Sequence, residues 1–239
     1  MNLTYNLNNI LFLDIETVPE EENWNLLSKN SQELFEQKTQ YQRKDEFTAE
    51  QFYNRAGIWA EFGKIICISV GYFVEVEKKR QLRLRSFFGD DEHKLLTEFK
   101  VLLDTHFAKK SNLLCAHNGK EFDFPFLSRR MIIHQIELPK KLNLFGKKPW
   151  EVPHIDTLEM WKFGDYKNYT SLHLLATIFG IPSPKDDMEG SDVHWVYWKD
   201  QDLQRIQTYC QKDVLTTAQL LLRFKGLPSI SDDAVSIVS

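Results

Sequence analysis

The order of strand-like and helix-like segments is the feature that most limits which folds this chain can adopt. Residues 10–13 are continuously apolar, residues 64–73 are apolar and rich in β-branched side chains, and residues 81–88 alternate between polar and apolar side chains. These patterns predict two buried strands and one half-exposed strand. The amphipathic stretch 91–107 predicts a helix, and the short apolar segment 112–116 predicts a further buried strand.

The rest of the chain is predicted to be mainly helical. Helical patterns cover residues 124–136, 171–180 and 202–225, whereas residues 137–153 hold three prolines and several lysines and are predicted to form a loop. Residues 154–161 begin as a strand or turn and then become helical. Strands, then strand–helix alternation, then helices predict an α/β fold in which a central mixed β-sheet is flanked by α-helices.

The length of the chain favours one domain over residues 1–225. Residues 20–55 are polar, with helical stretches around 30–40 and 48–55, and are interpreted as an insertion. Residues 226–239 are expected to be a loosely held C-terminal tail.

Composition excludes several classes of protein. The net charge of −4 argues against a protein that coats nucleic acid non-specifically, so any contact with nucleic acid must be local. The three cysteines lie far apart without a CxxC pair, which suits a reducing compartment and makes a zinc site improbable. The N-terminus has no basic region or cleavage site, and its apolar run is too short to span a membrane, so we expect a cytoplasmic protein.

Two acidic residues end the first predicted strand. Asp14 and Glu16 are two positions apart, so strand alternation places both side chains on one face. Carboxylates held that close repel each other unless a cation lies between them, and Mg²⁺ prefers oxygen ligands. Taken alone, the pair is a weak signal, because many Asp-x-Glu pairs merely end a strand.

Two further motifs carry acidic residues at informative positions. Asn118 and Asp123 follow the predicted strand 112–116, where a turn asparagine and a helix N-cap would be the ordinary explanation. Tyr209 and Asp213 are four residues apart on a predicted helix and therefore share a face, although a solvent-facing aspartate beside a core tyrosine would look the same. Together the three motifs predict carboxylates converging on two metal ions roughly 3.5–4 Å apart, an arrangement that clamps in-line displacement at phosphorus.

These motifs resemble those of a known family of nucleases. Residues 12–19 (FLDIETVP), 116–130 (AHNGKEFDFPFLSRR) and 209–217 (YCQKDVLTT) resemble the DxE, N-x3-(F/Y)-D and Y-x3-D exonuclease motifs of the DEDD superfamily. The tyrosine is typical of the DEDDy branch, and Thr208 stands where the DEDDh branch carries a histidine. Residues 116–130 together with 62–73 (FGKIICISVGYF) are similar to the proofreading domain of family B DNA polymerases, and the stand-alone bacterial group of predicted exonucleases related to that domain fits best. The resemblance covers residues 8–225.

The resemblance implies a ribonuclease-H-like fold and a role for each motif residue. Asp14 would bridge two Mg²⁺ or Mn²⁺ ions, Glu16 and Asp213 would complete the site of the ion that activates water, and Asp123 would help to hold the second ion. Tyr209 would orient the attacking water.

The resemblance also implies an activity and its substrate. The enzyme would be a metal-dependent 3′→5′ exonuclease that hydrolyses phosphodiester bonds at a single-stranded 3′ end, DNA more than RNA, and releases nucleoside 5′-monophosphates. Residues expected near the substrate are Asn118, Lys120, Phe122 and Thr17, whereas a structural role is expected for His117. The chain has no length for a polymerase domain, so a proofreading-type domain would work alone or with a separate replication or repair partner.

Binding the substrate strand requires local basic residues. The candidate groups are Lys78 to Arg80 with Arg83 and Arg85, Arg129 with Arg130, and Lys140 and Lys141 with Lys147 and Lys148. The loop 140–150 is the most suggestive of them, because Phe145 and Trp150 alternate with lysines, a combination that suits single strands. The aromatic cluster 194–198 is interpreted as packing, and the acidic segment 186–192 as surface.

Other classes of function are open at this point. A nuclease-like scaffold without activity is possible, although all four carboxylates and the tyrosine are present. A nucleotide phosphohydrolase would also use a carboxylate-bound metal pair. A zinc hydrolase lacks an HExxH motif or clustered histidine and cysteine, and a major-groove reader lacks a basic recognition helix.

Overall fold

A six-stranded mixed β-sheet forms the centre of the protein, in the order β5-β4-β1-β2-β3-β6. The computed structural model describes residues 5–44, 46–165, 167, 169–181 and 188–238. The strands are β1 (Ile10–Pro19), β2 (Gly63–Val76), β3 (Lys79–Phe88), β4 (Leu113–Ala116), β5 (Ile155–Asp156) and β6 (Val235–Ile237). Strands β1, β2 and β3 are antiparallel neighbours, whereas β4 runs parallel to β1 and β5 parallel to β4.

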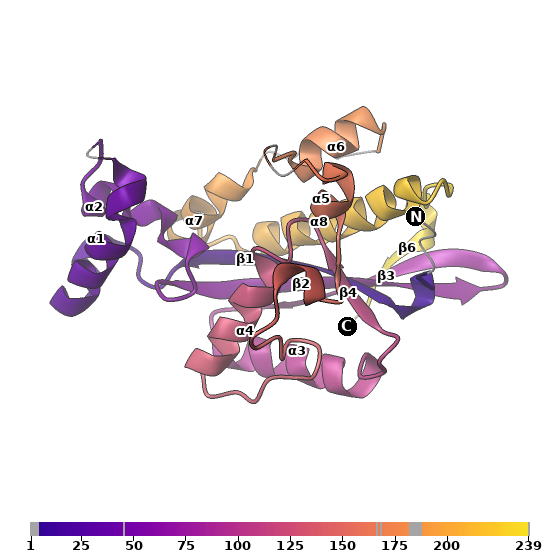
Figure 1. The fold of residues 1–239 in the computed structure, drawn as a ribbon, viewed down its shortest axis with the longest axis horizontal. Coiled ribbons are helices and arrows are strands. Elements are labelled where there is room, and N and C mark those ends of the chain that lie inside the picture. Colours follow the sequence, from indigo (N-terminus) through magenta and orange to yellow (C-terminus); the bar gives the residue numbers. More distant parts are fainter. Residues whose placement is uncertain (1–4, 45, 166, 168, 182–187, 239) are drawn as a thin grey trace.

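Helices cover both faces of this sheet (Figure 1). The lower face in that view carries α3 (Glu92–His106) and α4 (Asp123–Ile133), and the upper face carries α5 (Thr157–Lys162), α6 (Leu172–Ile178), α7 (Val193–Trp195) and α8 (Leu203–Phe224). A hydrophobic core lies on each face of the sheet, and alternate residues of β1 belong to one or the other. Leu11 and Leu13 pack with α3 and α4, whereas Ile10 and Phe12 pack with α8. The predicted α/β fold, a central mixed sheet flanked by helices, is confirmed.

Strand β1 is longer than its apolar run. The apolar run predicted a strand over residues 10–13, with Asp14 and Glu16 in the extended segment at its end, and the ladder with β2 continues from Leu11 opposite Tyr72 to Pro19 opposite Gly63. On the other edge, β4 pairs with β1 only as far as Phe12. The acidic half of β1 therefore pairs with β2 along one edge but not with β4 along the other. On that unpaired edge, the start of α4 contacts β1.

The insertion forms a small helical unit at one end of the sheet. It contains α1 (Lys29–Arg43), α2 (Ala49–Phe52) and the 3-10 helix η3 (Tyr53–Ile58), with an aromatic cluster of its own. Figure 1 shows α1 and α2 projecting beyond the end of β1. A register shift interrupts the β1–β2 ladder between Glu16 and Thr17, and there the Thr17 hydroxyl donates to the carbonyl of Gly57 in η3 at 2.7 Å. Such bulges commonly re-aim side chains beside functional sites.

The expectation of a loosely held C-terminal tail is wrong. β6 extends the sheet by pairing in parallel with β3, with Leu82 opposite Val235. The Gln219 side chain on α8 accepts the backbone N–H of Ile230 at 2.9 Å and donates to the carbonyl of Ile230 at 2.7 Å. These contacts hold the tail against β3 and α8, although its sequence gave no strand signal.

The other predicted elements agree with the structure apart from their ends. The helix predicted over residues 124–136 begins at Asp123 and ends at Ile133, shortly before Gln135 adopts a φ of 57°. The long helix predicted over residues 202–225 is α8, and Asp202 caps it by accepting the N–H of Arg205. Residues 137–153 are mostly irregular, as predicted, with one 3-10 turn at Pro149–Glu151. Part of the acidic segment 186–192 lies outside the described residues.

Candidate active site

Asp14 and Glu16 project from β1 toward α8, as strand alternation predicted. Ligand atoms of Asp14, Glu16 and Cys210 all lie within 4.8 Å of one another, and within the described part of the chain this is the group that could hold a metal ion. In the same described ranges, neither carboxylate takes part in an ion pair. Two buried acids therefore face each other without a basic side chain to neutralise them, which is costly unless they are protonated or bind a cation.

The remaining two motif aspartates lie in the same site. Burial raises the pKa of Asp14 well above its usual range, and the nearby charges of Asp213 and then Asp123 raise it further. Burial likewise raises the pKa of Glu16, followed by the charges of Asp14 and Asp213. The structure thus brings the four carboxylates, from β1, the start of α4 and the middle of α8, within electrostatic reach of one another.

The Asp123 carboxylate is buried with only part of its hydrogen-bonding capacity satisfied. It is the first residue of α4, but no side chain caps that helix. Its carboxylate accepts the backbone N–H groups of Asp123 itself and of Ile15, at the part of β1 that β4 leaves unpaired. Its Oδ1 is buried and has no hydrogen-bond partner among the described residues. Unpartnered buried oxygens are rare, and a carboxylate-oxygen donor set of this kind fits a hard divalent cation.

The metal-free protein is expected to lose stability as the pH rises through the titration of Asp123. Burial raises the pKa of Asp123 from 3.8 to about 8, so over that window the folded state holds a proton that the unfolded chain has lost. This contribution is complete below pH 4 and falls by at most about 1.4 kcal/mol per pH unit up to pH 8. Urea unfolding in a chelator, compared with Asp123→Asn, measures it; parallel pH profiles for the two proteins would contradict the assignment.

Tyr209 lies next to these carboxylates on α8. Its hydroxyl donates a hydrogen bond to Asp213, one helical turn further along, as the four-residue spacing predicted. Burial raises the pKa of the Tyr209 phenol far above its usual range, and the charges of Asp213 and Glu16 add to the effect. The phenol is therefore protonated at every working pH and acts as a hydrogen-bond donor rather than as a base.

Cys210 is a site residue that the sequence analysis missed. Its Sγ donates to Oδ2 of Asp14 at 3.3 Å and to the backbone carbonyl of Asp14 at 3.4 Å. Burial raises the pKa of the Cys210 thiol, so the group remains a neutral donor that orients Asp14. Its position directly after Tyr209 was the only signal, and cysteine has no pattern that marks such a role.

Asp156 was also missed, although it shapes the loop that carries Asn118. Its carboxylate accepts the backbone N–H groups of Asn118 and Lys120, both at 3.0 Å. The same carboxylate caps α5 by accepting from Leu158 at 2.9 Å and Glu159 at 3.3 Å. An aspartate just before a helical pattern signals an N-cap, but not the bonds to a loop nearly forty residues away.

Replacement of Asp156 by alanine is expected to lower the free energy of unfolding by about 2–4 kcal/mol. The variant loses the cap of α5 and leaves the N–H groups of Asn118 and Lys120 without their acceptor. Chemical denaturation measures the change, with the exposed turn residue Asp165→Ala as a matched substitution expected to cost less. A loss below about 1 kcal/mol would contradict the role assigned to these bonds.

The residues expected to contact substrate make structural contacts in this protein. Thr17 donates to Gly57, and the Lys120 ammonium pairs with Glu159 at 2.6 Å. Asn118 is half-buried and adopts a φ of 64°, and the half-buried Phe122 packs 5.4 Å from the ring of Phe126. His117 binds the Thr157 hydroxyl and the Thr170 carbonyl, both at 2.9 Å, and burial lowers its pKa, in agreement with the expected structural role.

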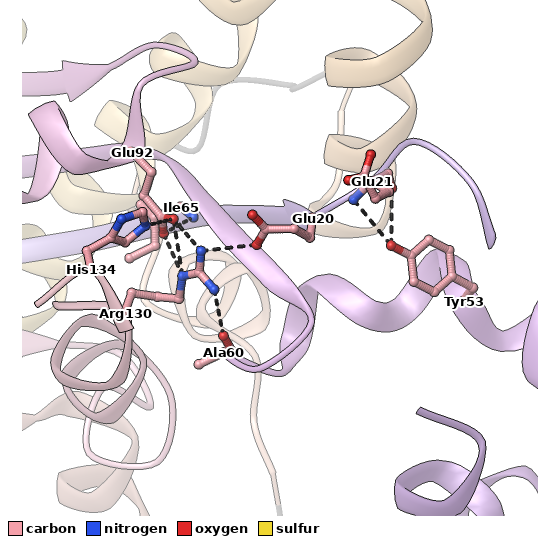
Figure 2. Close-up of polar contacts among 8 residues, drawn as sticks. All are labelled: Glu20, Glu21, Tyr53, Ala60, Ile65, Glu92, Arg130 and His134. Atoms are coloured by element: carbon pink, nitrogen blue, oxygen red, sulfur yellow. Dashed lines mark hydrogen bonds and ion pairs between the residues drawn. The ribbon is translucent and has the colours of Figure 1, made fainter. Parts of the chain in front are cut away.

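One of the basic groups proposed to bind phosphate is not available for it. Arg130 is buried and pairs with Glu92 and Glu20, and it donates to the carbonyl of Ala60 (Figure 2). Of the candidate pair Arg129 and Arg130, only Arg129 is exposed, because adjacent residues on a helix point in different directions. Residues 78–80 lie on the β2–β3 hairpin, at the end of β2 opposite to Gly63.

A final exposed aromatic lies beside motif residues. The ring of Tyr169 is exposed, yet it lies close enough to Asp123 and Asp156 for their charges to add to the desolvation that raises its pKa. Its neighbour Thr170 accepts the hydrogen bond from His117. No pattern in the sequence distinguishes this tyrosine from a loop residue.

Within the residues that the structure describes, no helix is both long and apolar enough to cross a bilayer.

Comparisons with known proteins agree with this arrangement. Residues 58–233 match the model of the family described as "Predicted 3'-5' exonuclease related to the exonuclease domain of PolB". Among curated proteins, no match was found. The chain is similar to a family B DNA polymerase from the hyperthermophilic archaeon Pyrobaculum calidifontis, with 16% identity and a TM-score of 0.49, covering 90% of this chain and 24% of the polymerase. Because the family model spans most of its length, the chain belongs to the family of predicted 3′-5′ exonucleases related to the exonuclease domain of PolB.

Proposed function

We propose that this protein is a metal-dependent 3′→5′ exonuclease of the DEDDy type, acting at a single-stranded 3′ end, on DNA in preference to RNA. The observation that carries the proposal is the meeting of four carboxylates in one site, where neighbouring charges raise the pKa of Asp14 and Glu16 and where Asp123 has an unpartnered buried oxygen. The products would be nucleoside 5′-monophosphates. Membership of the family supports nuclease activity. The single-stranded substrate, the preference for DNA and the metal-dependent mechanism are proposed in addition.

The four carboxylates would hold two Mg²⁺ or Mn²⁺ ions. Asp14 and Glu16 contribute from β1, Asp123 from α4 and Asp213 from α8. Bound divalent ions would make a hydroxide-like nucleophile available at neutral pH and stabilise both the attacking and leaving oxygens. The chain's own groups prepare the site, because the Cys210 thiol donates to Asp14 and orients it.

The Tyr209 phenol would position the attacking water. It is already bonded to Asp213, and its raised pKa leaves it a donor that cannot accept the proton of the nucleophile. The proton therefore leaves toward solvent or a metal-bound carboxylate rather than toward the phenol. Tyr209→Phe is accordingly expected to lower kcat by about 10²-fold with little change in KM.

The Tyr209 prediction has a matched control. Tyr41 is an exposed tyrosine on α1, remote from the carboxylates in sequence and fold, so Tyr41→Phe is expected to retain full activity. Single-turnover rates separate chemistry from product release. The role of the phenol would be contradicted by a Tyr209→Phe enzyme that keeps the wild-type single-turnover rate, or by an alkaline limb of the pH profile that disappears in the variant.

A ladder assay tests the proposed function. Single-stranded DNA and RNA of matched sequence, labelled at the 5′ end, are incubated with the protein in Mg²⁺ and separately in Mn²⁺. Progressively shorter labelled products indicate 3′→5′ exonuclease action, and the better substrate identifies the preferred sugar. Intact polymers in every lane would reject the proposal, and hydrolysis of free nucleotides alone would favour a phosphohydrolase.

A further inference from the structure

A pocket of about 420 Å³ lies between the outer face of α4 and the loop of residues 138–152. Pro125, Arg129 and Ile132 line it from the helix, and Leu144, Phe145 and Lys147 line it from the loop. The volume and the mixture of apolar and basic lining are those of ligand sites in proteins.

The pocket opens beside the loop that leads to Asp123. Lys120 lines its rim, and the backbone N–H of Lys120 is held by Asp156, the carboxylate that also holds Asn118. Asp123 is the first residue of α4, whose next two turns form the pocket wall. A ligand that begins at the carboxylates and continues over the Lys120 loop therefore reaches this pocket next.

The loop wall is rigid, although it displays large aromatic side chains. Lys141 donates to the carbonyls of Lys109 and Asn112 at 2.6 and 2.5 Å, and Ser128 on α4 donates to the carbonyl of Leu142 at 3.1 Å. Phe145 is nevertheless 74% exposed. Because Phe145 also lines the pocket, its exposed ring is available to stack on a ligand there.

The charge of the pocket fits a polyanion. Its two acidic rim residues, Glu121 and Glu159, already pair with Lys162 at 3.7 Å and Lys120 at 2.6 Å. Within the described ranges, neither Arg129 nor Lys147 takes part in an ion pair. The surplus charge at the pocket is therefore positive, although the whole chain carries −4.

We propose that this pocket binds an unpaired nucleotide of the substrate strand, upstream of the bond that is cut. The base stacks on Phe145 over the apolar floor, and Arg129 and Lys147 contact the flanking phosphates. This inference rests on the proposed exonuclease function. The pocket would select single strands, because a base that is paired in a duplex cannot enter it. Base–aromatic stacking and phosphate contacts are the usual means of holding single strands.

The test is binding in a chelator, where no hydrolysis occurs. Fluorescence anisotropy with labelled oligothymidylates of increasing length compares the full chain with Phe145→Ala, and Tyr41→Ala serves as control because Tyr41 is the equally exposed aromatic of α1. Phe145→Ala is expected to weaken binding of long strands roughly 10-fold and Phe145→Trp to restore it. The loss should appear only above the length at which a strand spans both sites.

A second variant separates phosphate contacts from stacking. Arg129→Ala with Lys147→Ala is expected to reduce the slope of log Kd against log salt by about 1–2, whereas Lys29→Ala, at an exposed position on α1, leaves it unchanged. Unchanged affinity of both pocket variants for long strands, or an equal loss with duplex DNA, would overturn the proposal. A wild-type protein that fails the ladder assay but shows these losses rejects the exonuclease while keeping the pocket, so the two failures are distinguishable.

Discussion

Asp14→Asn is expected to lower exonuclease activity by at least about 10³-fold while making the metal-free protein more stable. Asparagine has the same shape and still accepts the hydrogen bond from Cys210, but it carries no charge. Loss of a charged metal ligand removes several kcal/mol of transition-state stabilisation, and each 1.36 kcal/mol is a factor of ten in rate. The same change removes the repulsion that Asp14 exerts on Glu16.

The opposite signs of the two effects make this prediction specific. Burial and like charges raise the pKa of Asp14 and of Glu16, so at neutral pH the site strains the fold and any substitution that removes a charge relieves it. Thermal melts in a chelator at pH 8 and rates on a labelled strand measure the two effects on the same samples. Asp233→Asn, an exposed tail residue, serves as the control and should change neither.

Two results would contradict this account of Asp14. Retained activity would mean that the carboxylate is not part of the reaction. A variant that is inactive and also less stable in the chelator would mean that Asp14 acts as an ordinary structural hydrogen-bond acceptor. Addition of Mg²⁺ provides an internal check, because it should raise the melting temperature of the wild-type protein more than that of the variant.

Glu92→Ala is expected to cost about 3–5 kcal/mol of unfolding free energy. The Glu92 carboxylate accepts from Nε of Arg130 at 2.9 Å, from the backbone N–H of Ile65 at 2.8 Å and from His134 at 2.7 Å (Figure 2). Its removal leaves the guanidinium of Arg130, whose side chain is 4% exposed, with only the half-exposed Glu20 as a counter-charge. A buried charge that has lost its partner is among the most destabilising of single changes.

Two further variants separate the charge effect from the loss of packing. Glu20→Ala removes the exposed partner of the same guanidinium and is expected to cost about 1 kcal/mol or less. Replacing Glu92 and Arg130 together by methionine is expected to recover much of the loss, because no buried charge remains. Urea unfolding of all three variants measures these values, and a double variant as unstable as Glu92→Ala would refute the explanation.

Local patterns predicted most of the fold. The alternation of residues 81–88 and the helical spacing of residues 91–107 matched β3 and α3, because side-chain direction repeats every two or 3.6 residues whatever the rest of the chain does. The extent of β1 beyond Glu16 was not predicted, since its extended form there depends on the ladder with β2. β6 was missed because Val235–Ile237 is too short to show a periodic pattern and is recognised only by its pairing with β3.

Among the candidate site residues, local spacing placed some correctly, whereas others could be placed only by tertiary packing. Asp14 with Glu16, and Tyr209 with Asp213, were placed on common faces by spacing alone, and the resemblance supplied their expected roles. For the candidate pair Arg129 and Arg130, the sequence did not show which side chain is buried, because sequence neighbours on a helix point in different directions and only packing decides between them.

By itself, the sequence determined the α/β order of elements and which acidic side chains share a strand or helix face, because both follow from local backbone geometry. Tertiary structure alone decided that β1, α4 and α8 bring those faces together, that Asp156 and Cys210 support them, and that Oδ1 of Asp123 is buried without a partner. The physical reason is that desolvation and charge–charge repulsion depend on distances between atoms far apart in the chain. Those two effects, and not the identity of the residues, raise the pKa values of Asp14, Glu16 and Asp123.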